Sequence, residues 1–402
     1  MIAKASGGVV ALLLFGCGRS ASDSRSVETD ESRPQGPADE RKSTPGEAVP
    51  LSAMRTRRYP AEEEPASLSF AEREDPKRMA TVSPSLPAGS PEVARQTMEQ
   101  LSRVDPNRRA LTTEQAAGFN KMFARLREQG ASAIPVIAEY LSHNQDVRFD
   151  AVPGGRQVGF ASVRLGLIDT LDKLGGAEAV EVASSALDST GEPVEIAWLT
   201  RVLEHQSPGQ YRAAELATVG EFLQRVNSGQ LKSSDVSALF ETAQAVGDSS
   251  LVPALTQAVP ESKYYATLAL AGLRDWAGIP ALIELARDPK ITAIGIGDLA
   301  LRPLAQLAIQ SQAATFELLE QARQNKIPDS AWPTVVASLA GSYIQYGNQI
   351  FNSTAPSVNW TAGEIAKRKA LLNNMLSVTP NATGRQAIQE ALVTVSRKVP
   401  GQ

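Results

Sequence analysis

From about Pro91 almost to the end of the chain, apolar residues recur every three or four positions. One such stretch carries Val163, Leu167, Ile168, Leu171 and Leu174. This spacing gathers apolar side chains on one face of an α-helix. No segment shows the alternation of apolar and polar residues that predicts a half-buried strand. The period therefore predicts an all-α fold with about sixteen helical segments over residues 91–400.

A short block recurs within this region and predicts that the helices are organised in antiparallel pairs. Each copy runs from the end of one helix to an apolar residue and a proline that begin the next helix. The copies are Gly130–Pro135, Gly247–Pro253 and Ala277–Pro280, and a fourth, Gly175–Val180, has valine in place of proline. Glycine ends a helix by adopting a left-handed backbone, and proline is tolerated in a first turn. We expect Ser132 and Ser250 to cap the helices that follow them.

These blocks are unevenly spaced, and the interval from Pro253 to Pro280 is the shortest. In its helix-turn-helix pattern the chain resembles the HEAT-repeat and armadillo-like α-solenoids, closely over Thr112 to Asp288 and more loosely to Val399. The resemblance implies an irregular solenoid of stacked helix pairs, in which each pair touches mainly its neighbours. It also implies a concave surface, lined by the second helix of each pair, that binds a protein or a peptide.

The N-terminus predicts export and lipidation. Lys4 precedes an apolar run from Val9 to Phe15, which is too short to span a bilayer but suits a signal peptide. Leu14-Phe15-Gly16-Cys17 then resembles a bacterial lipobox, although Phe15 is larger than the residue usual there. The resemblance implies lipid attachment to Cys17, cleavage before it, and an outer-membrane location facing the periplasm or the cell surface. An ordinary signal peptide or a buried N-terminal helix is the alternative.

Residues 17–90 differ in character from the rest of the chain. Prolines recur throughout, serine and charged residues fill most of the remainder, and apolar residues are isolated. Such a composition buries too little apolar surface to offset the entropy of ordering. We therefore predict a signal peptide over 1–16, a disordered linker over 17–90 and a helical domain over 91–400. A segment that folds on a partner, around Arg55–Glu64, is the alternative for the linker.

The composition argues against several classes of function. The net charge of −4 lacks the strong basic excess typical of nucleic-acid binding. One cysteine and two histidines are fewer than the four ligands that a structural zinc site of cysteine and histidine needs. We therefore predict no metal and no cofactor. The sequence contains no Walker phosphate loop, no His-Glu-x-x-His helix and no Gly-x-Ser-x-Gly elbow. The chain is therefore predicted not to be an enzyme.

Long connections between helix pairs are the candidate binding regions, because insertions on one side of a solenoid often form its binding face. One runs from Asn144 to about Ser162, and its candidate binding residues are Arg148, Phe149, Arg156 and Phe160. A second runs from Asp288 to Gly297. The alternative is structural: the arginines would be solvated or paired, and the two aromatics would pin the loop to the core.

Three further sets of residues receive structural interpretations. Trp198, Trp276 and Trp332 are expected in the core. The run Lys367-Arg368-Lys369 is expected to be a solvated helix face. His205 ends a helix, where a histidine cation is expected to interact favourably with the helix dipole.

The sequence as a whole predicts a membrane-anchored, non-enzymatic scaffold that binds a protein or peptide in the bacterial envelope. Two alternatives remain. One is a structural or assembly component of the envelope. The other is an enzyme or enzyme subunit, since some HEAT-like proteins are associated with lyase activity on bound chromophores.

Overall fold

The structure is a computed structural model that describes residues 89–103, 110–143, 145–231, 236–288, 290–291, 297–342, 350–351 and 360–398. All of these belong to a single unit of the chain, Lys77–Gln402. Every regular element within them is helical, and the only β-type pairing is an isolated bridge between Arg148 and Ser162. The described part of the chain is therefore all-α, as the helical period predicts. The predicted signal peptide and nearly all of the predicted linker lie outside the described residues.

Most of the helices follow one another with short connections, and the connections from α3 to α4 and from α14 to α15 are longer. In chain order they are α1 (Pro91–Ser102), α2 (Thr113–Glu128), α3 (Ile134–Ser142), α4 (Val163–Leu174), α5 (Gly176–Ser189), α6 (Pro193–Gln206), α7 (Arg212–Asn227), α8 (Ser237–Val246), α9 (Val252–Gly272), α10 (Ile279–Arg287), α12 (Gly297–Leu307), α13 (Gln312–Arg323), α14 (Trp332–Leu339), α15 (Ala362–Val378) and α16 (Ala382–Ser396). Short 3₁₀ helices add η2 (Gly130–Ala133), η3 (Gly155–Val158), η4 (Ser249–Leu251) and η5 (Arg274–Trp276).

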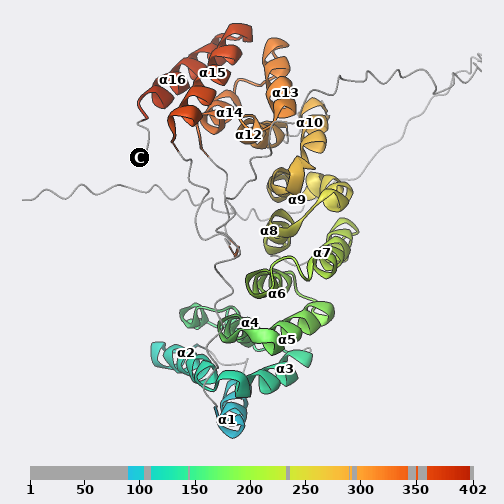
Figure 1. Ribbon diagram of the computed structural model, residues 1–402, viewed down its shortest axis with the longest axis vertical. Helices are drawn as coiled ribbons and strands as arrows, with labels where there is room; N and C mark the ends of the chain where they lie inside the picture. The colour runs from blue at the N-terminus through green and yellow to red at the C-terminus, as the bar shows by residue number, and fades with distance from the viewer. Residues whose placement is uncertain are drawn as a thin grey trace, which may run out of the picture. The chain divides into compact units, whose positions relative to one another are not determined.

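These helices stack as pairs in two layers. Helices α2, α4, α6 and α8 pack successively against one another, as do α12, α14 and α16. Helices α3, α5, α7 and α9 form a second series, and α10, α13 and α15 continue it. Figure 1 shows the alternation of consecutive helices between the layers. Because each helix contacts mainly its neighbours along the chain, the fold is the irregular stack of helix pairs predicted from the sequence.

Helix α9 explains the short interval between Pro253 and Pro280. Its backbone leaves helical geometry at Ser262 (φ −108°, ψ 34°), two residues after Pro260. Proline lacks a backbone donor and clashes with the preceding turn, so it bends a helix at this point. The helix packs on both α7 and α12. One of its halves thus completes a pair with α8 and the other begins a pair with α10, and a kink replaces the loop between them.

Three of the turns between described helices share a 3₁₀ turn followed by a helix with proline in its first turn. This arrangement precedes α3, α9 and α10, as the recurring block predicts. The predicted caps are wrong, because neither serine accepts a bond from the helix that follows it. Ser132 instead donates to the Gly89 carbonyl (2.9 Å), and Ser250 donates to Asp248, whose carboxylate caps the turn.

Glycine has two different roles in these turns. Gly130 (φ 59°) and Gly175 (φ 65°) adopt the predicted left-handed backbone. Gly278 does not; a Cβ there would lie 2.0 Å from the Leu270 carbonyl oxygen. In that turn glycine is required because two backbone segments approach closely, a role that the sequence pattern alone does not distinguish.

The core is continuous from α1 to α16 and consists mainly of leucine, alanine, valine and isoleucine. Its largest fully buried side chains include Trp332, Phe123, Phe149 and Phe240. Trp332 thus confirms its predicted core position. Trp198 is only half-buried, and the Arg201 guanidinium lies over its ring, 4.2 Å from the centroid.

Candidate functional site

The loop from residue 145 to 162 is folded into the domain. The Phe149 amide donates to the Ala161 carbonyl (2.7 Å), and the Val163 amide donates to the Val147 carbonyl (3.0 Å). The Leu111 amide ties the middle of the loop down by donating to the Pro153 carbonyl (2.8 Å). These bonds give the loop a defined conformation between α3 and α4.

The two aromatic residues of this loop contact the core. Phe149 is 1 % exposed, and its ring centroid lies 4.9 Å from that of Phe119. Phe160 lies edge-on to Phe123 (5.4 Å) and Trp198 (6.2 Å). Phe149 therefore offers almost no surface to a partner, and Phe160 is half-buried against α2 and α6.

The two arginines of the loop lie at the surface. Arg148 forms a bidentate pair with Asp150, at 3.0 and 2.6 Å, and the guanidinium holds the pKa of that carboxyl below its usual value. Arg156 is exposed on η3 and has no ion pair with a described residue. The four candidates thus do not form one surface, and binding by this loop stays a prediction.

Arg368 corrects the expectation that residues 367–369 form a solvated face. Its side chain is 2 % exposed and donates to the Leu339 carbonyl (2.6 Å) and to the Glu364 carboxylate (2.7 and 2.9 Å). It therefore satisfies backbone at the end of α14. The sequence does carry a signal for this, because Arg368 lies on the apolar stripe of α15 between Ile365 and Leu372.

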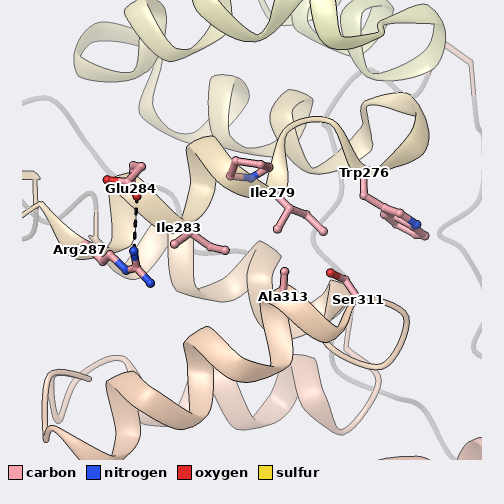
Figure 2. Close-up of a pocket in the computed structure, with 8 residues that line it drawn as sticks. Trp276, Ile279, Ile283, Glu284, Arg287, Ser311 and Ala313 are labelled. Atoms are coloured by element: carbon pink, nitrogen blue, oxygen red, sulfur yellow. Dashed lines mark hydrogen bonds and ion pairs between the residues drawn. The ribbon is translucent and has the colours of Figure 1, made fainter. Parts of the chain in front are cut away.

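A groove of about 430 Å³ lies between α10 and α13, and we call it groove A. It is lined by Trp276, Ile279, Pro280, Ile283, Glu284, Arg287, Ser311 and Ala313. Figure 2 shows Ile279 and Ile283 pointing from α10 toward Ala313 on the opposite wall. Mostly apolar walls with a few polar groups are typical of binding sites.

An ion-pair cluster bridges the two helices of groove A. Arg287 donates from Nε to both oxygens of Glu317, at 3.0 and 3.1 Å, and from Nη1 to Glu284 at 3.4 Å. Glu317 is buried and also accepts from Gln321 (2.7 Å). The Glu284–Arg287 contact is the dashed line in Figure 2. The cluster fixes the spacing of the helices at the end of α10.

At the other end of α10 the backbone is strained. Asp275 (φ 53°) and Trp276 (φ 58°) are consecutive left-handed residues that are not glycine. Each such residue costs on the order of 1–3 kcal/mol and is retained where the surroundings or the function require it. Trp276 was expected in the core, but it is half-buried and lines groove A. No periodic pattern reports a left-handed tryptophan, so the sequence predicted a core position for Trp276 and not its place at the groove.

Phe316 is the most exposed large apolar side chain among the described residues, at 61 %. It lies on α13 one helical turn after Ala313 of groove A. The other strongly exposed apolar residue, Val393 (51 %), lies on α16. On α13, Ala313 of groove A and the exposed Phe316 thus lie at neighbouring positions.

A second groove, of about 500 Å³, lies between α14 and α16, and we call it groove B. Its lining includes Ala337, Ala340, Ala387, Ala391, Trp360, Glu390 and Lys398. The Lys398 ammonium lies over the Trp360 ring, 4.8 Å from the centroid. No pattern in the sequence connects Trp360 with Lys398.

Two polar clusters link neighbouring helices. In the first, Asp172 on α4 contacts Arg201 (3.1 Å) and His205 (2.8 Å) on α6. The His205 ring therefore has a carboxylate partner in addition to its position at the end of α6.

In the second cluster, Arg212 binds Glu204 (2.8 Å) and lies 3.8 Å from Glu215. Glu215 is fully buried, and neither of its carboxylate oxygens accepts a hydrogen bond from a described residue. Burial, together with the charge of Glu204, raises its pKa from 4.5 to about 8. This carboxyl is thus protonated at neutral pH.

Neither cluster defines a metal centre, and the described residues contain no group of three or more potential metal-ligating acidic, histidine or cysteine side chains. In the same part of the chain, no helix has the length and apolar character that crossing a membrane requires. Comparisons with protein-family models, curated proteins and solved structures found no match to this chain.

Proposed function

We propose that this chain is a non-enzymatic, lipid-anchored scaffold of the bacterial envelope that binds a protein partner through groove A. The observation that carries the proposal is the exposed apolar surface formed by the groove and Phe316. Exposed apolar patches with a polar rim are typical of protein interaction sites. Tryptophan is also common among the residues that contribute most to binding energy.

The arrangement of groove A supports a preformed binding site. The ion pair between Arg287 on α10 and Glu317 on α13, with 3.0 Å between donor and acceptor, fixes the separation of the two helices. The strained turn at Asp275 and Trp276 directs the tryptophan to the groove rather than to the core. A partner that buried this surface would therefore meet little cost of reorganisation.

Photo-crosslinking in intact cells tests the proposal. A photoreactive residue at Ile283 should give a discrete crosslinked protein, and Phe316→Ala should reduce that product at least tenfold. Val393→Ala is the matched control, because it removes the other exposed apolar side chain and should leave the product unchanged. A crosslinking pattern insensitive to Phe316→Ala would overturn the assignment of groove A.

The envelope location depends on Cys17, which lies outside the described residues. The lipobox-like run Leu14–Cys17 supports lipidation there. Cys17→Ser should release the protein from membranes and block processing at that position. A Cys17→Ser chain that stayed membrane-bound and was processed identically would refute the anchor, without bearing on groove A.

A further inference from the structure

Groove B exists because small side chains face each other across α14 and α16. At the start of the two helices the Trp332 ring fills the space, so closely that a Cβ on Gly384 would lie 2.5 Å from it. Further along, alanines at 337, 340, 387 and 391 line the groove. Alanine side chains cannot span the distance that tryptophan fills, and an apolar channel remains.

The two charged residues of groove B are available at its rim. Lys398 lies over Trp360 and forms no ion pair with any described carboxylate. Among the described residues, the Glu390 carboxylate accepts a hydrogen bond only from the Gln386 side-chain amide (3.0 Å) and pairs with no cation. Both side chains are exposed. Lys398 follows Glu390 by eight positions, and its amide continues the last turn of α16 by donating to the Val395 carbonyl (3.2 Å). The backbone positions of the two residues therefore lie about 12 Å apart at the rise of a helix.

A ligand that complements this groove has a negative and a positive end, about 10–12 Å apart, and a small apolar middle. An extended chain spans about 3.3–3.6 Å per residue, so the two termini of a peptide of three or four residues have this separation. The volume of about 500 Å³ accommodates such a peptide if its side chains are small.

We propose that groove B binds a short zwitterionic peptide of small residues, with its carboxylate at Lys398 and its ammonium group at Glu390. Trp360 would cover the carboxyl-terminal residue while it retains the Lys398 ammonium on its ring face. The alanines would contact the peptide side chains. This site shares no residue with groove A, so the proposal goes beyond the scaffold function and is tested separately from it.

Calorimetric titration of the full-length protein with trialanine tests the proposal. We expect saturable binding that weakens at least tenfold when the peptide is N-acetylated, and likewise when it is C-amidated. Each modification removes one of the two charges on the ligand while leaving its apolar part unchanged.

Variants of groove B identify which residue binds which charged end of the peptide. Lys398→Ala should weaken trialanine binding about as much as C-amidation does, and the variant should then be indifferent to amidation. Glu390→Gln should have the same relation to N-acetylation. Lys367→Ala, which removes an exposed charge on α15, is the control and should bind normally. Circular dichroism should show equal helix content in all three variants.

Two outcomes would overturn the proposal. One is no detectable binding of trialanine at millimolar concentration. The other is binding of the doubly capped peptide as tight as that of free trialanine, which would mean that the groove takes an internal segment of a longer chain. Neither outcome bears on crosslinking at Ile283.

Discussion

At the scale of single residues, the surroundings of a charged pair decide what it contributes. Arg164 on α4 forms a bidentate pair with Glu195 on α6, at 2.7 and 2.9 Å, and Arg148 forms one with Asp150. Arg164 is 4 % exposed and also donates to the Leu141 and His143 carbonyls, at 2.9 and 2.7 Å. Arg148 lies at the surface, where solvent screens its pair with Asp150.

Arg164→Ala should therefore destabilise the fold far more than Arg148→Ala does. The first variant leaves Glu195 and two carbonyls buried without their donor, at a cost of about 3–5 kcal/mol. The second should cost less than about 1 kcal/mol. Urea unfolding followed by circular dichroism measures both. Equal midpoints for the two variants would show that the Arg164 cluster is not the inter-helix link that its bonds indicate.

Glu215 makes stability depend on pH. Its pKa is about 8 in the folded protein and near 4.5 in the unfolded chain, so between these values the folded state binds the extra proton. Stability should fall as the pH rises from about 5 through 8, because the unfolded chain releases a proton that the folded protein retains.

Glu215→Gln should remove this dependence. The variant should resemble the natural protein at pH 5 and exceed its stability at pH 9 by on the order of a few kcal/mol. Thermal unfolding at both pH values provides the measurement. Glu221→Gln changes an exposed residue of the same helix and should leave the pH profile as it is. A profile unaltered by Glu215→Gln contradicts the proposed burial of a protonated carboxyl.

At this scale the sequence was informative for some residues and not for others. The sequence shows that Arg368 lies on the apolar stripe of α15. Because Arg368 is the middle residue of a run of three cations, however, that run favoured a surface position. The burial of Phe149 depends on contact with Phe119, thirty positions away, and no local period reports it. The left-handed conformation of Trp276 depends likewise on tertiary packing.

At the scale of elements, helix type and pairing were predictable because both follow from local rules. Apolar period defines a helix, and the glycine and proline positions mark where one ends and the next begins. The kink in α9 was not predicted as such, although Pro260 marks it. The prediction that Ser132 and Ser250 cap helices was wrong, because the Ser132 hydroxyl donates to the distant Gly89 carbonyl and the Ser250 hydroxyl donates to Asp248.

Alanine substitutions at two glycines distinguish a glycine that is required for lack of space from one that only adds backbone flexibility to the unfolded chain. Gly278→Ala should destabilise by about 1–3 kcal/mol, since its Cβ would overlap the Leu270 carbonyl in the turn before α10. Gly118→Ala, in α2, has no atom within 4 Å of its new Cβ and should stabilise by about 0.5–1 kcal/mol. Thermal unfolding of both variants gives the signs, and a neutral Gly278→Ala would show that the turn can relax.

At the scale of the whole molecule, the stacked arrangement limits how far a perturbation travels. Helices contact mainly those one or two positions away along the chain. The stability of such an array is approximately a sum of the stabilities of its repeats and of the interfaces between neighbours. Grooves A and B share no residue, but α13 of groove A packs on α15, and α15 packs on both helices of groove B. A perturbation should therefore reach both grooves before it reaches helices further along the stack, such as α2 to α5. The grooves themselves could not be predicted from sequence, because they depend on which side chains fail to fill the space between helices.

Hydrogen exchange measures how far a perturbation travels along the stack. Leu372→Ala opens a cavity in α15 and Leu167→Ala one in α4, and each leucine is fully buried, so both should cost about 2–5 kcal/mol. Leu372→Ala should raise exchange in α13 to α16 and leave α2 to α5 unchanged, because no packed helix joins the two regions directly. Leu167→Ala should produce the reverse pattern. If either substitution raised exchange uniformly along the chain, the helices would unfold as one cooperative unit rather than as an array of neighbouring repeats.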